Sequence, residues 1–187
     1  MGVVNVTPDS FSDGGVNFEP ADALGSARRM LDEGAAIVDV GGESTRPGSQ
    51  SVSLEEELRR VVPVLEGLRG VPVSIDTAKS QVAARALELG AELVNDVTAL
   101  RADPELAGVV ADHGAYLCLM HMQGEPRTMQ EDPRYDDVVA DVARFLDERL
   151  GFAVSQGIPR SRSASTPGSA SARPWSTTSS SCAAWTS

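Results

Sequence analysis

The sequence predicts an α/β fold made of repeated strand and helix units, an incomplete (β/α)8 TIM barrel of about five units followed by an irregular C-terminal tail. Short apolar segments alternate with amphipathic ones at intervals of roughly 20 to 35 residues, the pattern of a parallel sheet with helical crossovers. Polar residues gather at or just past the carboxyl end of each predicted strand, as at a barrel mouth, whereas a doubly wound sheet concentrates its ligand groups at one switch point.

The predicted strands are apolar runs that lead directly into polar loops. The first, residues 1–6, runs into NVTPDSFSDGG, and the second, residues 36–40, runs into GGESTRPGS. Three more strands are expected at residues 71–77, 91–97 and 115–121. Oxygen-rich loops at strand ends suit phosphates and hard cations, so the chemistry is expected on this side of the sheet.

Helical spacing of apolar residues predicts the intervening helices at 22–33, 54–68, 81–89, 104–112 and 135–154. Ser53 and Glu56 predict a capping box at the start of the second helix, and Pro63 predicts an interruption within it. Gly34, Gly90, Gly114 and Gly157 each follow one of these helices within three residues, which is typical of a helix C-terminus.

Composition and charge exclude several classes of protein. The net charge of -11 argues against nucleic acid and anionic membrane partners. No apolar run is long enough to cross a bilayer and no basic signal segment opens the chain, so a cytoplasmic location is expected. Cys118 and Cys182 lie too far apart in the sequence to indicate a disulfide framework or a metal site.

Five motifs in order carry a family resemblance. NVTPDSFSDGG, taken residue by residue, is more simply a turn-rich connection, because its residue types are the commonest turn formers. With GGESTRPGS at 41–49, SIDT at 74–77, VND at 94–96 and LMHMQGEPRTMQ at 119–130, however, it resembles dihydropteroate synthase over residues 1 to about 160. That family joins 6-hydroxymethyl-7,8-dihydropterin pyrophosphate to p-aminobenzoate and releases pyrophosphate, giving dihydropteroate for folate.

The resemblance implies contacts to the pyrophosphate end of the substrate. Asn5 corresponds to the protein ligand of a magnesium ion, Mg2+, that holds the pyrophosphate. Thr45 and Arg46 correspond to the contact of the second loop with the substrates. Taken alone, Arg46 before a proline is equally compatible with a surface cation.

The resemblance also implies a pterin pocket and a p-aminobenzoate pocket. Asp76 and Asn95 correspond to hydrogen-bond partners of the pterin ring, and Met120 lines the pterin wall. Phe11 and Pro47 belong to the loops that form the p-aminobenzoate pocket. A carboxylate beside a carboxamide matches the donors and acceptors of a pterin edge in one orientation only, which agrees with these roles.

No catalytic side chain is expected, because departure of pyrophosphate leaves a cation delocalised into the pterin and the arylamine then needs only to be positioned. The expected partners are the two small substrates, and full-length members of the family are expected to be homodimers. Two alternatives stay open. One is a pterin-binding methyltransferase domain, although GGESTRPGS and the loop of Phe11 favour the synthase; the other is a non-catalytic pterin-binding remnant.

Several single residues have a simpler interpretation beside the functional one. Asp76 and Asn95 could be turn formers or helix caps after a strand. Lys79, four residues into its segment, is expected to be solvated rather than catalytic. His121 is equally compatible with a polar group at the mouth and with a packed core position. Cys118, inside an apolar strand, is expected to behave as a small buried hydrophobic residue.

Residues 161–187 form the second expected region, a low-complexity tail that is rich in serine and contains no acidic residue. If residues 166–174, TPGSASARP, are back-translated with GC-rich codons and read from one base earlier, they give DPGIGFGKT. This resembles the sixth-strand motif of the family, and an amphipathic segment follows in the same frame. We therefore expect a frameshifted tail, an uncovered core and a chain that is weakly active or inactive.

Overall fold

The computed structural model describes residues 1–7, 20–44, 50–122 and 137–167. Within them, six strands form one parallel sheet in the order β1-β2-β3-β4-β5-β6, the order of consecutive barrel strands, which confirms the predicted fold class. The strands are β1 (Gly2–Asn5), β2 (Val38–Gly41), β3 (Val73–Asp76), β4 (Leu93–Asp96), β5 (Tyr116–Met120) and β6 (Ser163–Thr166).

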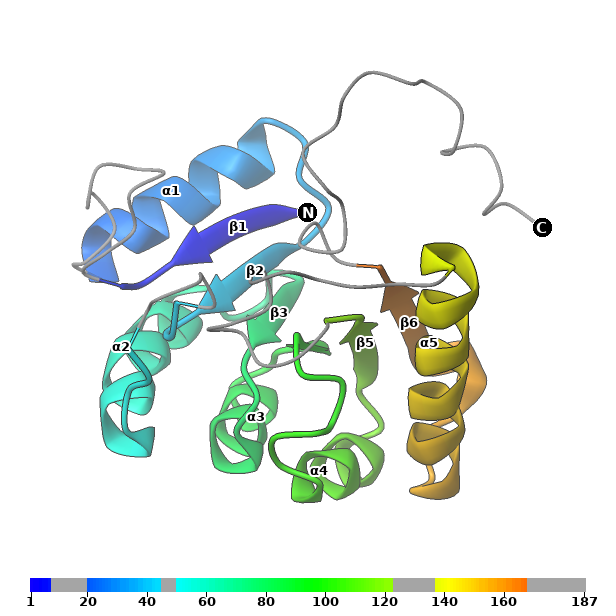
Figure 1. The fold of residues 1–187 in the computed structure, drawn as a ribbon. Helices are drawn as coiled ribbons and strands as arrows, with labels where there is room; N and C mark the ends of the chain where they lie inside the picture. Colours follow the sequence, from blue (N-terminus) through cyan, green and yellow to red (C-terminus); the bar gives the residue numbers. More distant parts are fainter. Residues whose placement is uncertain (8–19, 45–49, 123–136, 168–187) are drawn as a thin grey trace.

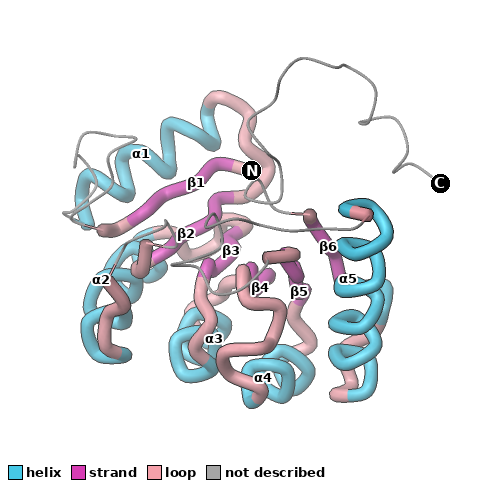
Figure 2. Tube along the Cα trace, in the orientation of Figure 1, coloured by secondary structure: helices cyan, strands magenta, loops and turns pink. Residues whose placement is uncertain are grey.

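Helices cover one side of the sheet and follow its curve (Figure 1). They are α1 (Pro20–Asp32), α2 (Leu54–Gly67), α3 (Ser80–Glu88), α4 (Glu105–His113) and α5 (Val138–Ser155). The strands fan out inside this row of helices (Figure 2). Among the described residues, no helix combines the length and apolar character that crossing a membrane requires.

The core lies between the helices and one face of the sheet. Side chains alternate between the two faces of a strand. The set that packs against the helices is apolar and fully buried, and includes Val4, Val40, Ile75, Val94 and Leu117, which the strand register aligns. The alternate residues therefore project from the opposite face, and these are largely polar.

The helix boundaries agree with the predicted ranges to within three residues, but two details of α2 differ. Ser53 caps this helix as predicted, since its Oγ accepts from the N–H of Glu56 at 3.2 Å. The Glu56 carboxylate instead pairs with Arg59 and Arg60, at 2.8 and 2.7 Å, rather than completing a capping box. Pro63 does not interrupt the helix, which continues to Gly67.

Strand β6 adds one strand to the five that were expected. It follows a single 3-10 turn, Arg160–Arg162, and its residues pair in parallel with β5 from Leu117 to Met120. The hydrophobic pattern could not indicate it, because Ala164 is the one apolar residue in SAST. Its extended conformation is instead stabilised by backbone pairing to the edge of β5.

Candidate functional site

A row of polar positions crosses the sheet near the carboxyl ends of the strands. The register aligns Asn5 with Gly41, Gly41 with Asp76, Asp76 with Asn95, and Asn95 with Cys118. Each of these residues follows a core-facing neighbour such as Val4 or Ile75, so the row lies on the face away from the helices. Four side chains and one glycine, from five consecutive strands, thus share one surface.

Gly41 leaves open the space between two of these side chains. A Cβ atom at Gly41 would lie 3.4 Å from Asn5 Oδ1, 3.4 Å from Asp76 Cβ and 3.6 Å from Asp76 Oδ2. The amide oxygen of Asn5 and the carboxylate of Asp76 therefore converge over the glycine. This arrangement forms a small cradle lined by oxygen atoms at the end of β1, β2 and β3.

Beneath the row lies a second pair of polar residues, two positions earlier in their strands. Asp39 is 3% exposed, Ser74 is 0% exposed, and the two are partners in the β2–β3 register. Asn95 donates a hydrogen bond from Nδ2 to Asp39 Oδ2 at 2.9 Å. The other carboxylate oxygen of Asp39 and the Ser74 hydroxyl are buried without a hydrogen-bond partner of good geometry. Such groups are costly in a folded protein and are candidates for contact with a ligand or an ordered water.

The carboxylates of the site resist ionisation. Burial, followed by the negative charges of Asp39, Asp96, Glu57 and Glu43, raises the pKa of Asp76 well above its ordinary value. Burial also raises the pKa of Asp39, against the opposing influence of the Ser74 and Asn95 side chains. The site thus clusters carboxyl groups for which the negatively charged form is unfavourable, an electrostatic imbalance. A ligand that supplies hydrogen-bond donors would relieve this imbalance.

The turn after β4 holds Asn95 in place. Asp96, on the helix side of the sheet, accepts from the N–H and hydroxyl of Thr98, both at 2.8 Å, and from the N–H of Leu100 at 2.6 Å. These bonds support Ala99 and Leu100 at positive φ angles of 54° and 62°, which non-glycine residues rarely adopt. Arg149 of α5 donates to the carbonyls of the same two residues at 2.7 and 3.2 Å.

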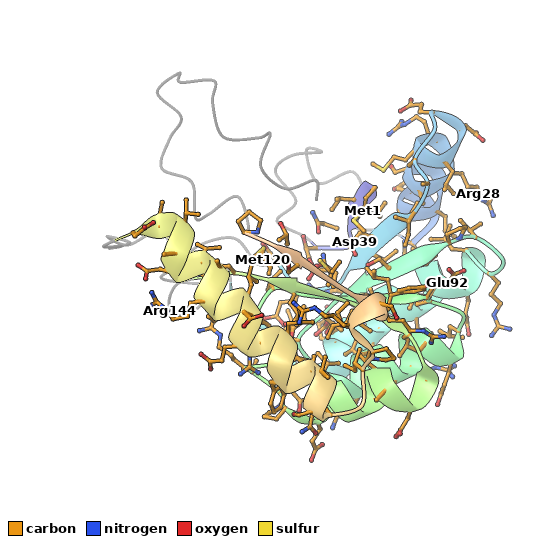
Figure 3. The ribbon with its side chains drawn as sticks, turned by 90° about the vertical axis from the view of Figure 1, so that its right-hand side faces the viewer. Met1, Arg28, Asp39, Glu92, Met120 and Arg144 are labelled. Atoms are coloured by element: carbon orange, nitrogen blue, oxygen red, sulfur yellow. The ribbon has the colours of Figure 1, made fainter. Side chains whose placement is uncertain are left out.

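The structure brings together three of the predicted site residues, Asn5, Asp76 and Asn95. Met120 ends β5 next to them and is partly buried. In Figure 3, which looks from the α5 side, Asp39 and Met120 are labelled near the middle, while Arg28 and Arg144 lie on the outer helices. The other predicted site residues, Phe11, Thr45, Arg46 and Pro47, lie outside the described residues.

Sequence reasoning missed Asp39. The available signal was a carboxylate in the middle of the apolar run AAIVDVGG, where an acidic residue has no place on a helix-covered face. Because β2 ends at Gly41, Asp39 lies one layer deeper than Asp76 and faces the same way. Its identification needed the register of the neighbouring strands.

The structure also decides between the simpler and the functional interpretations of Lys79, His121 and Cys118. Lys79 is not solvated, since its side chain is 27% exposed and its ammonium group contacts the carboxylates of Glu43 and Glu57. His121 occupies a packed position rather than the mouth, because its ring meets Phe145 of α5 edge-on with centroids 4.9 Å apart. Burial and then the charge of Arg101 lower the pKa of His121.

Cys118 belongs to the polar row and is only partly buried, so it is not simply a core residue. Burial, and then the charges of Asp39 and Asp76, raise the pKa of its thiol. The thiol is therefore kept neutral, as a weak donor beside a group of acceptors.

The oxygen atoms of the cradle are of the kind that hard cations prefer. Across the part of the chain that the structure describes, no group of three or more His, Cys, Asp and Glu side chains is arranged to hold a metal ion. Magnesium in phosphate-binding sites commonly uses only one or two protein ligands, with water and phosphate oxygens completing its shell. The amide oxygen of Asn5 fits that mode of binding and does not fit a metal site built entirely from protein ligands.

Comparison with known proteins gives matches over most of the chain. Residues 1–169 match the model of the family described as pterin binding enzyme. The dihydropteroate synthase of Escherichia coli (strain K12) is 47% identical over 171 residues, which are 90% of this chain and 60% of that protein. The chain thus spans 60% of the length of this relative.

Solved structures give the same result. A Yersinia pestis dihydropteroate synthase with a sulfonamide drug complex superposes with a TM-score of 0.86 at 46% identity, covering 90% of this chain and 62% of that one. A Xanthomonas albilineans dihydropteroate synthase with 4-aminobenzoic acid superposes with a TM-score of 0.80 at 48% identity, covering 90% and 60%. The residues matched by the family model, 1–169, include the strands that carry the polar row.

Proposed function

This chain belongs to the family of pterin-binding enzymes, and we propose that its function is that of a dihydropteroate synthase. The reaction joins 6-hydroxymethyl-7,8-dihydropterin pyrophosphate to p-aminobenzoate, giving dihydropteroate and pyrophosphate. The observation that carries the proposal is the acceptor-rich row at the strand ends, in which Asp76 and Asn95 are register partners above the buried Asp39. The binding of 4-aminobenzoic acid by the Xanthomonas relative supports the second substrate.

Asp76, Asn95 and Asp39 are suited to hold the pterin ring. The ring carries N–H donors along its pyrimidinone edge, and carboxylate and amide oxygens are their natural acceptors. Because one N–H of Asn95 Nδ2 is bound to Asp39, the amide is held in one orientation, and its oxygen is the acceptor that it offers to the ligand. Met120, at the end of β5, would contact the ring face as an adaptable apolar side chain.

The chemistry requires positioning more than a nucleophile on the protein. The bond between the pterin methylene carbon and the pyrophosphate oxygen breaks, the electron pair leaves with pyrophosphate, and the arylamine nitrogen bonds to the methylene carbon and loses a proton. Asn5 would hold a magnesium ion, which would supply charge to stabilise the leaving pyrophosphate. The row fixes the orientation of the methylene carbon relative to the amine, which is the contribution these residues can make.

The remaining contacts belong to the same proposal. Thr45 and Arg46 would contact the substrates through the second loop, and Phe11 and Pro47 would form the p-aminobenzoate pocket. A cytoplasmic location and, for full-length members of the family, a homodimer complete the proposal. The net charge of -11 supports small-molecule substrates over nucleic acid.

Incorporation of radiolabelled p-aminobenzoate by the purified protein tests the function. Production of dihydropteroate above the protein-free rate supports synthase activity. Binding of the pterin pyrophosphate without incorporation would support a non-catalytic pterin-binding remnant instead. Absence of both would contradict the proposed function.

A further inference from the structure

Lys79 connects three elements at the edge of the polar row. It lies between β3 and α3, and its ammonium group contacts Glu43, two residues beyond the end of β2, and Glu57 of α2 at 2.5 Å. These two carboxylates are 36 and 22 residues away in the sequence. Lys79 is the only lysine in the chain.

This group of charges is buried enough to be structurally important. The side chain of Glu57 is 1% exposed and those of Lys79 and Glu43 are each 27% exposed. Burial alone would lower the pKa of Lys79, but the hydrogen bonds and charges of Glu43 and Glu57 outweigh it and raise that pKa. Removing the ammonium group would leave a buried carboxylate without its cation, a far larger disturbance than loss of a surface ion pair.

The contacts reach the segments that follow two neighbouring positions of the polar row, Gly41 and Asp76. The hydroxyl of Thr77, the residue after Asp76, donates to Glu57 Oε1 at 2.7 Å and accepts from the Lys79 N–H at 3.2 Å. Glu43 follows Gly41 of the cradle by two residues. A second contact holds the same segment, since Arg60 donates to the Gly42 carbonyl at 2.9 Å.

We infer that Lys79 is a positioning residue, which fixes the segment leaving β2 against the segment leaving β3 and thereby sets the geometry of the cradle between them. Its charge is taken up by Glu43 and Glu57, so it does not bind phosphate or take part in the reaction. The part of this inference that concerns substrate rests on the proposed function. The part that concerns the two strand ends does not.

Hydrogen exchange of backbone amides tests the positioning directly. In Lys79→Met, amides in peptides covering residues 38–44 and 73–79 should exchange at least about tenfold faster than in the wild type. Lys79→Arg keeps a cation that can pair with both carboxylates and should restore most of the protection. Arg85→Ala is the matched control, because it breaks the exposed Arg85–Glu88 pair on the adjacent helix.

A second variant covers the case in which Lys79→Met does not fold. Glu43→Ala leaves the contact between Lys79 and Glu57 intact, so exchange should rise in the 38–44 peptide alone. Unchanged exchange in that peptide, or the same increase in Arg85→Ala, overturns the inference. Failure of Lys79→Arg to restore protection would also overturn it, because it would trace the effect to packing rather than charge.

Binding of 6-hydroxymethyl-7,8-dihydropterin pyrophosphate, measured by calorimetry below the unfolding temperature, separates this inference from the proposed function. Lys79→Met should weaken affinity by about tenfold and Lys79→Arg should recover it. If the wild type does not bind this compound, the proposed function fails while the exchange result still decides the positioning role. If the wild type binds and Lys79→Met binds equally well, the positioning role toward substrate is wrong.

Discussion

The side-chain amide of Asn95 donates from Nδ2 to Asp39 Oδ2 across 2.9 Å, and this bond fixes which end of the amide faces the mouth of the sheet. A free asparagine could turn either its donor or its acceptor toward a ligand. Here one of the two N–H groups of Nδ2 is bound to Asp39, so the amide is held in one orientation and its oxygen is available as an acceptor. Asp39 thereby determines the orientation of the Asn95 side-chain amide, which lies one layer above it.

Replacing Asn95 by Leu should remove pterin binding while the protein stays folded. The change deletes the acceptor and leaves Asp39 without its donor, at a cost of about 1–3 kcal/mol in the free energy of unfolding. Calorimetric titration and circular dichroism of the variant test this. The matched control is Gln81→Leu, which replaces an exposed amide on α3 and should leave both the pterin affinity and the circular dichroism spectrum unchanged. Unaltered pterin affinity in Asn95→Leu would return Asn95 to the role of a turn former.

Asp76→Asn should stabilise the protein at neutral pH. Because the folded pKa of Asp76 is raised, its contribution to stability is fully present below the unfolded pKa of about 3.9 and is lost as pH rises through the folded pKa. The neutral variant should therefore gain on the order of 1–2 kcal/mol near pH 7 and lose this advantage near pH 4.

Urea unfolding across pH 4 to 8 measures that difference. Asp112→Asn, on an exposed residue of α4, is the control and should show no comparable pH dependence. The same Asp76→Asn substitution should weaken pterin binding, since the site loses a carboxylate acceptor. A variant less stable than the wild type at neutral pH would show that Asp76 makes a favourable contact that outweighs its burial.

Much of this site was predictable because the signal was local. Asp76 and Asn95 directly end apolar runs, so a strand prediction alone placed both at the same edge of a parallel sheet. Asp39 was not predictable in this way, because it lies inside its strand and its direction depends on register with β3. Lys79 was assigned to solvent because both of its partners are more than 20 residues away.

In the fold, too, elements with a local sequence signal were predicted, and elements that depend on distant residues were not. Strands β1 to β5 carry apolar residues on the helix-facing side and were predicted from that pattern. Strand β6 has a polar sequence, SAST, and depends on backbone pairing with β5, which no hydrophobic pattern reports. Pro63 was expected to interrupt α2, yet the helix passes through it, because tertiary packing of Val61, Val64 and Leu65 outweighs the local penalty of proline.

Gly41→Ala should block the cradle with little effect on folding. The added methyl group would lie 3.4 Å from both Asn5 Oδ1 and Asp76 Cβ, which is ordinary van der Waals contact, so the stability change should stay within about 1 kcal/mol. Ligand atoms, however, could no longer enter between the two side chains. Binding of the pterin pyrophosphate should fall at least about tenfold, equivalent to roughly 1.4 kcal/mol.

Gly25→Ala on α1 is the matched control, because a Cβ atom there meets nothing within 4 Å. It should leave affinity unchanged and stabilise the helix slightly. Equal affinity in Gly41→Ala and the wild type would show that the cradle is not part of the binding site.

Binding of pyrophosphate should depend on magnesium through Asn5. Titration of inorganic pyrophosphate with magnesium, with EDTA, and after magnesium is restored measures the dependence. Asn5→Ala should lower the magnesium-dependent affinity for pyrophosphate at least about tenfold. Mutating a residue that only hydrogen-bonds to a metal ligand already costs about this much in metal affinity. Equal affinity with and without EDTA would remove Asn5 from the metal-binding role.

Position 166 offers a way to test the interpretation of the tail in the protein itself. Thr166 ends β6 and is the register partner of Met120, and Ala164 is the partner of Cys118, so position 166 belongs to the series that faces the polar row. In the alternate reading of TPGSASARP as DPGIGFGKT, the residue at this position is aspartate. The frame that restores the family motif thus places a carboxylate on the same face of the sheet as Asp76 and Asn95.

Thr166→Asp should therefore tighten binding of the pterin pyrophosphate by several-fold to about tenfold, the range of one charge-assisted hydrogen bond. Ser165→Asp is the control, because residue 165 pairs with the core-facing Leu119 and projects the other way. Sequencing the DNA that encodes residues 160–187 completes the test: we expect a neighbouring frame that encodes DPGIGFGKT. No such frame, together with equal affinities for Thr166→Asp and the wild type, would contradict the frameshift and make SAST the native end of this strand.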